Sequence, residues 1–265
     1  LINTIFASFL ASGSISWLYY ADRLMEFPAG VLGVALSTIL LPNLSKSFSR
    51  KKTVDYSELV NWGLRLGILL AVPAATALAI LAIPLISTLF YYGAFTETDI
   101  LMTQYALIAY SIGLVGLILI KILAPAFYAQ QNVKTPVKIA LFTLFCTQFM
   151  NLIFIGYLKH TGLALAIGLG ACINAALLFY HLKKGQAFKL NAGWTMFLIK
   201  IIFAAFVMAL GLFYFKGTID LWINYSAFSR FVHLITLILF GATLYFITLR
   251  LCRLDIAEFF KKTIQ

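Results

Sequence analysis

Asp22-Arg23-Leu24-Met25-Glu26 is a charged cluster inside an apolar run that extends over residues 15–42. A run of this length can cross a bilayer as a helix. Charged residues inside the bilayer are costly, and they normally face a polar cavity or a partner. Asp22 and Glu26 share one helix face, and Arg23 can reach Glu26 one turn away. Because one arginine cannot neutralise two carboxylates, the cluster predicts a water-filled pathway or a ligand site.

Two alternatives to a pathway or ligand site stay open for the cluster. The charges could form a structural network of ion pairs that holds neighbouring helices together. The cluster could also lie near the outer membrane interface, where charged side chains reach water.

The rest of the chain has the composition of a membrane protein. It has 265 residues, 62% of them hydrophobic and only 11% charged, and its mean hydropathy is +0.96. A soluble domain is nearer one quarter charged. We therefore predict an all-α, polytopic transmembrane helix bundle. The expected segments are a partial span at 1–11 and full spans near 15–42, 59–91, 100–129, 136–158, 162–182, 194–215 and 229–250.

The basic residues predict how the bundle is oriented. The net charge of +11 falls mainly between the apolar runs, so membrane topology and anionic lipid explain it better than nucleic acid does. Fourteen of the twenty lysines and arginines lie in one set of alternate loops and three in the other. By the positive-inside rule, this split predicts a cytoplasmic C-terminus.

The remaining charged residues and prolines within the spans are less specific signals. Arg65 either extends its charge to the inner membrane interface or takes part in function. For Lys121, a place in the same cavity as Arg23 and a place outside it are equal alternatives. Prolines inside the runs indicate bent helices, which suit a transporter, although kinks that serve only packing are an equal alternative. These prolines are Pro28, Pro73, Pro84 and Pro125.

The sequence contains no motif for catalysis or for a cofactor. The three histidines do not cluster, the three cysteines have no metal-ligand spacing, and no phosphate loop or nucleophile elbow is present. We expect neither an enzyme nor a metal site.

The two ends of the sequence carry separate expectations. The chain starts with Leu1 inside an apolar run, which suggests a piece of a larger protein. The segment 254–265 is too short to span and can place Ile256, Phe259 and Phe260 on one helical face. We expect it to lie on the inner membrane surface, with a disordered basic tail as the alternative.

Two long motifs resemble the MurJ/MviN family of lipid II flippases, in particular its proteobacterial members. The first is Asn3-Thr4-Ile5-Phe6-Ala7-Ser8-Phe9-Leu10-Ala11-Ser12-Gly13, and the second is Trp17-Leu18-Tyr19-Tyr20-Ala21-Asp22-Arg23-Leu24-Met25-Glu26-Phe27-Pro28. Shorter matches are Leu123-Ala124-Pro125-Ala126-Phe127-Tyr128-Ala129 and Lys134-Thr135-Pro136-Val137-Lys138. The resemblance extends along the whole chain and weakens after about residue 190.

The resemblance implies a second transporter lobe at 1–190 and two additional C-terminal spans with a short cytoplasmic tail at 191–265. It implies a multi-pass protein of the bacterial inner membrane that moves lipid II from the inner to the outer leaflet by alternating access. The implied partners are lipid II, membrane lipids and the N-terminal half of the same protein, with no nucleic acid and no cofactor. The last two spans resemble a pair that forms a lipid-facing groove, which suits the polyprenyl tail.

The resemblance also implies roles for individual residues. Arg23 matches a cavity arginine and would contact the substrate's pyrophosphate, since guanidinium groups bind such anions bidentately. Asp22 and Glu26 would hold Arg23 and pair with cations of the other lobe in one gating state. Ser16 matches a portal-lining position, and Lys121 is a further candidate for substrate binding.

One family feature is doubtful in this sequence. Some relatives have a sodium site with a carboxylate on the span that corresponds to 136–158, where this chain offers only Thr147 and Asn151, with Ile167 opposite. We therefore expect the membrane potential, rather than sodium, to drive transport. Two functional alternatives remain, namely a transporter of another substrate on the same fold and a non-transporting scaffold in cell-wall assembly.

Overall fold

The computed structural model describes residues 2–185 and 187–254, and every regular element within these ranges is a helix. The helices are α1 (Ile2–Ser8), α2 (Ser14–Ser49), α3 (Thr53–Ile80), α4 (Ala82–Phe90), α5 (Glu97–Ala129), α6 (Lys134–Lys184), α7 (Trp194–Phe215), α8 (Ile219–Asn224) and α9 (Ala227–Leu251). The expectation for the C-terminal tail falls on residues 255–265, which lie outside the described ranges.

Six of the described helices are long and apolar enough to cross a membrane, namely α2, α3, α5, α6, α7 and α9. They account for the seven expected full spans, because α6 contains two of them. With 51 residues, a straight α6 would extend roughly 75 Å, more than twice the hydrocarbon thickness of a bilayer. Lys159 breaks it with a non-helical backbone (φ 51°, ψ −131°).

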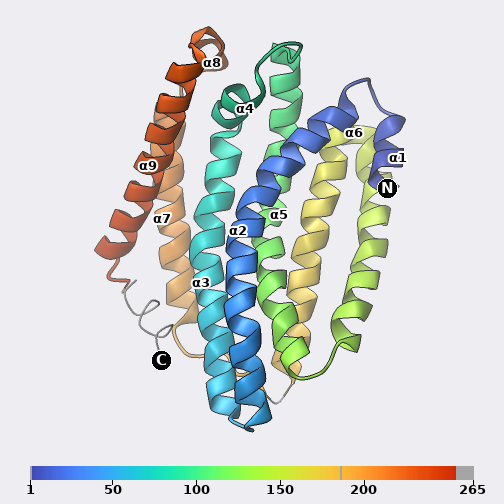
Figure 1. The fold of residues 1–265 in the computed structure, drawn as a ribbon, viewed down its shortest axis with the longest axis vertical. Coiled ribbons are helices and arrows are strands. Elements are labelled where there is room, and N and C mark those ends of the chain that lie inside the picture. The colour runs from blue at the N-terminus through green and yellow to red at the C-terminus, as the bar shows by residue number, and fades with distance from the viewer. Residues whose placement is uncertain (1, 186, 255–265) are drawn as a thin grey trace.

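The two arms of α6 run antiparallel from that break (Figure 1). Asn174 on the second arm donates to the Thr143 hydroxyl on the first at 3.3 Å, and Gly170 lies against Thr147. The sequence expectation of two spans was therefore correct, and the loop between them is reduced to a sharp reversal.

The expected span 59–91 is divided into two helices. α3 ends at Ile80 and α4 begins at Ala82, with Leu81 in a non-helical conformation between them. Pro84 lies in the first turn of α4, where its missing N–H removes no helical bond.

At the start of α2, Gly13 has a left-handed backbone (φ +96°) and separates α1 from α2. A Cβ at this position would also come within 2.7 Å of the Trp17 ring. The expected partial span at 1–11 is therefore the short helix α1, turned away from α2.

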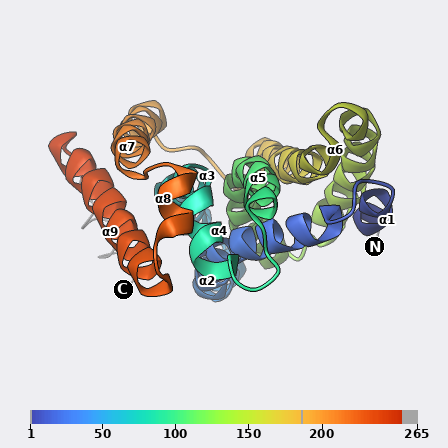
Figure 2. The same cartoon turned by 90° about the horizontal axis from the view of Figure 1, so that it is seen from above.

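The bundle is organised around α5, which packs against α2, α3, α4 and α6. Seen from above, α7, α8 and α9 lie on one side of this centre, and α1 and α6 lie on the other (Figure 2). α7 packs on α3 and α9, and α9 also contacts α4.

The connections gather at two opposite ends (Figure 1). The turn after α2, the turn between α5 and α6, and the segment between α6 and α7 lie at what we call the basic end, which carries most of the loop lysines and arginines. α9 runs toward the same side and ends at a higher level (Figure 1). The α4–α5 loop, the α6 reversal and α8 lie at the opposite end. The alternation predicted from the loop charges is therefore present in the fold.

Close backbone contact between α5 and α6 yields a test of this packing. A Cβ at Gly113 would meet the backbone of Gly168, whereas a Cβ at Gly156, on the first arm of α6, would meet nothing within 4 Å. Gly113→Ala should lower the midpoint of thermal unfolding in detergent, because overpacking costs about 1–3 kcal/mol. Gly156→Ala makes the same chemical change in open space and should leave the midpoint unchanged or raise it. Equal effects of the two substitutions would contradict this packing.

Candidate functional site

The charged cluster lies in the third and fourth turns of α2, and the helical period divides its residues between two faces. The buried face of α2 contains Ser14, Leu18, Ala21, Met25 and Ala29, which point into the bundle. The exposed face contains Ser16, Tyr19, Arg23, Glu26 and the partly exposed Gly30. These residues recur at three- and four-residue spacing and therefore form one stripe along α2.

Arg23 is held by two neighbours on this exposed stripe. Its Nη1 donates to Glu26 Oε2 at 2.9 Å, and its guanidinium lies 4.9 Å from the centre of the Tyr19 ring. The side chains of Arg23 and Glu26 are 57% and 55% exposed. Because both residues belong to α2, this ion pair does not join two helices of the described structure.

Asp22 takes no part in this ion pair. Its half-buried side chain lines a pocket of about 240 Å³ between α1, α2, α5 and α6, and Tyr19, Tyr110 and Asn3 line the same pocket. Among the described residues, no cation lies within ion-pair distance of its carboxylate. The two carboxylates thus differ in their surroundings: Glu26 pairs with Arg23 and Asp22 lines the pocket.

The other predicted site residues lie at different distances from Arg23. Ser16 is exposed two turns before Arg23 on the same stripe. Lys121 is on α5, and its aliphatic stem packs against Gly33, which lies roughly 15 Å along α2 from Arg23. The structure therefore groups Ser16 with Arg23 and places Lys121 further toward the basic end.

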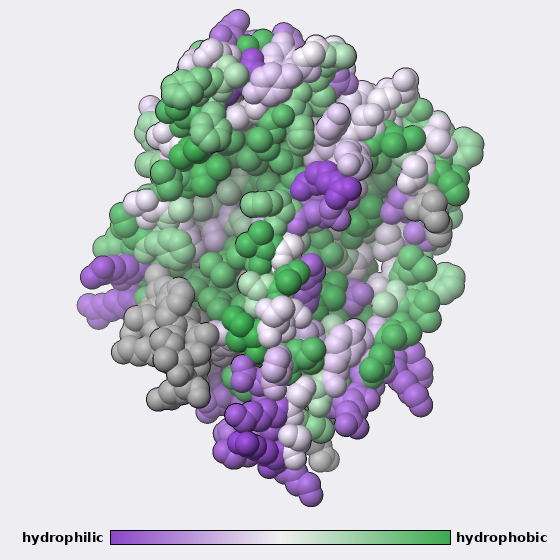
Figure 3. Space-filling view, viewed as in Figure 1, coloured by the Kyte–Doolittle hydropathy of each residue, from purple (hydrophilic) through white to green (hydrophobic). Residues whose placement is uncertain are grey.

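The stripe is open to the outside of the lobe. A Cβ at Gly30, two turns beyond Arg23, would meet no atom within 4 Å. On the face of the molecule with α2 in front, a compact hydrophilic patch interrupts the apolar surface over the upper part of α2 (Figure 3). A polar group on such an exposed, largely apolar face is available to a ligand or to another protein surface.

Tyr19 is the residue of this site to which the sequence analysis assigned no role. A tyrosine four residues before an arginine on a predicted helix lies on the same face. That spacing is the signal that could have identified it as a support for the guanidinium.

Two of the residues considered for sodium make hydrogen bonds with separate partners. Asn151 is fully buried and donates to the side-chain oxygens of Asn3 and Gln148 at 2.7 and 3.2 Å. The Thr147 hydroxyl donates to the backbone oxygen of Thr143. In the described part of the chain, no group of three His, Cys, Asp or Glu side chains could hold a metal ion.

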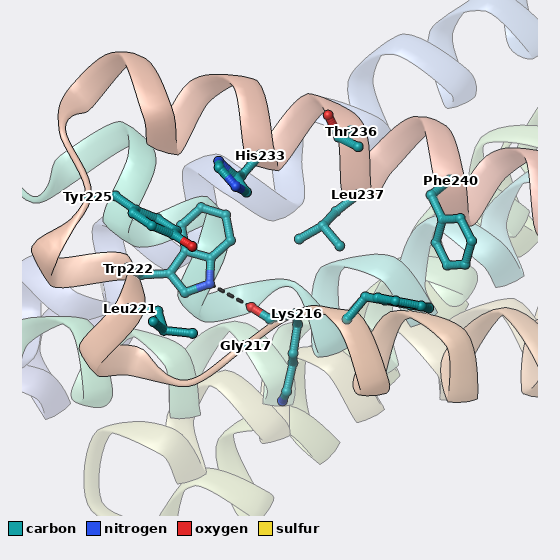
Figure 4. Close-up of a pocket in the computed structure, with 10 residues that line it drawn as sticks. Lys216, Gly217, Leu221, Trp222, Tyr225, His233, Thr236, Leu237 and Phe240 are labelled. Atoms are coloured by element: carbon teal, nitrogen blue, oxygen red, sulfur yellow. Dashed lines mark hydrogen bonds between the residues drawn. The ribbon is translucent and has the colours of Figure 1, made fainter.

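A second pocket, of about 300 Å³, lies between the end of α7, α8 and the start of α9 (Figure 4). Three of its polar side chains are already hydrogen-bonded to the backbone. Trp222 donates to Lys216 O at 2.6 Å, His233 to Ser229 O at 2.8 Å and Thr236 to Val232 O at 2.8 Å. The pocket therefore offers a largely apolar lining and lies apart from the charged stripe.

Comparison with known proteins gives consistent matches. The family model described as lipid II flippase MurJ matches residues 1–251. A lipid II flippase MurJ of Burkholderia cenocepacia is 52% identical over 209 residues, which cover 79% of this chain and 40% of that protein. A probable lipid II flippase MurJ of Buchnera aphidicola (subspecies Schizaphis graminum) is 43% identical over 267 residues, which cover all of this chain and 52% of that protein.

A solved structure agrees with these sequence matches. The structure of a lipid II flippase MurJ in an inward closed conformation superposes with a TM-score of 0.77 at 26% identity, and the match covers all of this chain and 52% of that one. The chain thus spans about half the length of the relatives that it matches. On the sequence match, the fold and the helix order together, the chain belongs to the MurJ family of lipid II flippases.

Proposed function

We propose that this chain forms one lobe of a transporter that moves lipid II, the undecaprenyl-pyrophosphate-linked peptidoglycan precursor, from the inner to the outer leaflet by alternating access. The observation that carries the proposal is an exposed guanidinium on a membrane helix, held from two sides by Glu26 and Tyr19. A guanidinium suits the pyrophosphate because it can donate two parallel hydrogen bonds. Membership of the flippase family supports lipid II as the substrate.

In this proposal, the stripe on α2 is one wall of a central cavity. Arg23 contacts the pyrophosphate, Glu26 fixes the guanidinium between transport steps, and Ser16 lines the entrance. Asp22 contributes charge from the pocket behind the stripe, and Lys121 extends the cationic surface toward the basic end. The facing wall comes from a first lobe, since the family's proteins are about twice as long as this chain.

The proposed topology follows from the charge distribution. The basic end faces the cytoplasm, so the C-terminus is cytoplasmic and the α4–α5 loop, the α6 reversal and α8 face the periplasm. Residues 1–190 form the transporter lobe, and 191–265 add the last two spans. The function is transport rather than catalysis, and the driving force is the membrane potential.

The role of Arg23 can be tested in the full-length protein, in cells depleted of their own lipid II flippase. Arg23→Ala should abolish growth rescue and reduce the lipid II exposed on the outer leaflet on the order of ten-fold or more, because a charge-assisted contact to the pyrophosphate is lost. The transport activity of Arg23→Lys should lie between that of the unmodified protein and that of Arg23→Ala, since lysine keeps the charge but lacks the planar guanidinium that donates two parallel hydrogen bonds. Immunoblots of the membrane fraction should show equal insertion of all three proteins.

The same assay separates the alternatives. Failure of the unmodified full-length protein to rescue growth would favour a transporter of another substrate on this fold. Full activity of Arg23→Ala at normal membrane levels would favour a scaffold that does not transport.

The role of Tyr19 predicts a difference between two substitutions. Tyr19→Phe keeps the aromatic face under the guanidinium and should transport at nearly the normal rate. Tyr19→Ala removes that face and should slow outer-leaflet delivery of lipid II by a few-fold, roughly the range of an exposed cation–π contact. Equal rates for the two variants would show that the ring does not position Arg23.

A further inference from the structure

We propose that the last two membrane helices act as a brace, which holds α3 rigid at Pro73 and makes α3, α4, α7 and α9 move as one rigid body. The proposal rests on polar attachments at three depths between the C-terminal helices and the α3–α4 pair. It concerns motions within this lobe and holds for any transported substrate.

The middle attachment supplies a hydrogen bond that a proline removes from α3. Pro73 has no N–H, so the carbonyl of Leu69 loses its helical donor four residues on. Tyr245 of α9 supplies the missing donor, because its hydroxyl donates to Leu69 O at 2.9 Å. The Tyr245 side chain is only 1% exposed. An unsatisfied carbonyl inside the membrane is costly, so bending α3 at Pro73 away from α9, or withdrawing α9, would leave the Leu69 carbonyl without a partner.

The attachment at the end opposite the basic end is made by Arg230 in the first turn of α9. Its guanidinium donates to Ser87 O and Tyr91 O at 3.3 and 3.2 Å, at the C-terminal end of α4, and to Ile223 O at 2.9 Å, in α8. It also lies 4.8 Å from the centre of the Tyr91 ring.

This arginine is 6% exposed, and no carboxylate among the described residues pairs with it. Its charge is balanced by the carbonyl ends of two helices, where the helix dipole is negative. Arg230 therefore fixes α9 to α4 and α8 at once, and moving it away would expose a buried charge.

The attachment at the basic end uses one face of α3, where Ser57, Asn61 and Arg65 follow at four-residue spacing. Asn61 is 2% exposed and makes four hydrogen bonds. Its Nδ2 donates to Ser57 O and Lys189 O at 2.8 Å, and its Oδ1 accepts from the backbone N–H of Asn191 at 3.2 Å and from Trp194 Nε1 at 2.9 Å. These bonds satisfy all four hydrogen-bonding positions of an asparagine side chain.

Arg65 extends the attachment by one turn. Its Nη2 donates to Ala192 O at 3.0 Å, and its guanidinium lies over the rings of Trp194 and Phe197, at 5.5 Å from each centre. The segment that leads into α7 is thereby held along two turns of α3.

The three attachments matter because apolar packing alone holds helices weakly in lipid. Lipid chains are as apolar as leucine side chains, so helix association depends on close packing and on hydrogen bonds between helices. A single attachment would leave α9 free to pivot on α3. α9 is attached in the middle and at the end opposite the basic end, and the start of α7 is attached at the basic end. Together these contacts oppose tilting and sliding of the α7–α9 pair, so any change of access must occur elsewhere in the lobe.

The proposal can be tested by pulsed spin-label distance measurements on the full-length protein in lipid, after replacement of its native cysteines. One label pair at Val54 and Leu89 reports the bend of α3–α4, and another at Val54 and Phe228 reports the position of α9; all three native side chains are exposed. In the unmodified protein, both distributions should be narrow and should stay the same when conditions shift the transporter between access states.

Tyr245→Phe removes one hydroxyl and keeps the ring, so it should broaden the Val54–Leu89 distribution. Tyr214→Phe is the matched control, because Tyr214 is 81% exposed on α7, where its hydroxyl bridges no two helices of the described structure; it should change neither distribution. Arg230→Lys keeps the charge but cannot span three carbonyls, so it should broaden the Val54–Phe228 distribution. A distance that changes between access states in the unmodified protein, or a Tyr245→Phe variant with an unchanged bend, would overturn the brace.

Discussion

The requirement that every backbone polar group inside a bilayer must find a partner within the protein is the constraint on which this structure depends. Helices satisfy it along their length, and side chains satisfy it where a helix ends or contains proline. The Tyr56 hydroxyl donates to Ala126 O at 2.7 Å near the end of α5, and Gln130 donates to that hydroxyl. Tyr245 and Arg230 do the same for α3 and α4. The helices are therefore held to one another at the points where their own hydrogen bonding fails.

The same constraint separates the arginines by role. Arg65 and Arg230 donate to backbone carbonyls of neighbouring segments and lie over aromatic rings, so their positive charges stabilise the fold. Arg23 contacts no backbone carbonyl in the described structure and pairs only within its own helix. An arginine that the fold does not use, on an exposed and largely apolar face, is the one that can bind something else. This difference supports Arg23 as the functional residue more strongly than its presence in a membrane helix does.

Hydropathy and loop charge were sufficient to predict the spans and their alternation, because the length of an apolar run is set by the bilayer. They could not predict the break at Leu81, because it does not change the apolar character of the sequence. They placed a loop between residues 158 and 162, but did not predict its reduction to a sharp reversal at Lys159 within one continuous helix. The sequence could not distinguish the roles of Arg65 and Arg230, because the carbonyl contact of Arg65 and two of the three carbonyl contacts of Arg230 are with residues more than 100 positions away in sequence. The helical period predicts that Asp22 and Arg23 point in different directions. The packing of α5 and α6 against α2 shows that Asp22 is the one that lines the internal pocket.

The charge balance of the stripe limits what one lobe can do. Asp22, Arg23 and Glu26 together carry a formal charge of −1, which by itself would repel a pyrophosphate. For the substrate to bind here, the cationic character of the site must come from Lys121 and from the facing wall. Glu26 must then leave Arg23 and pair with cations of that wall. Tyr19 holds the guanidinium from the other side, so the release of Glu26 frees its N–H groups without loss of position. Under the proposed function, the paired state in this structure would be the resting form of the arginine, and substrate binding would be coupled to the approach of the opposite wall.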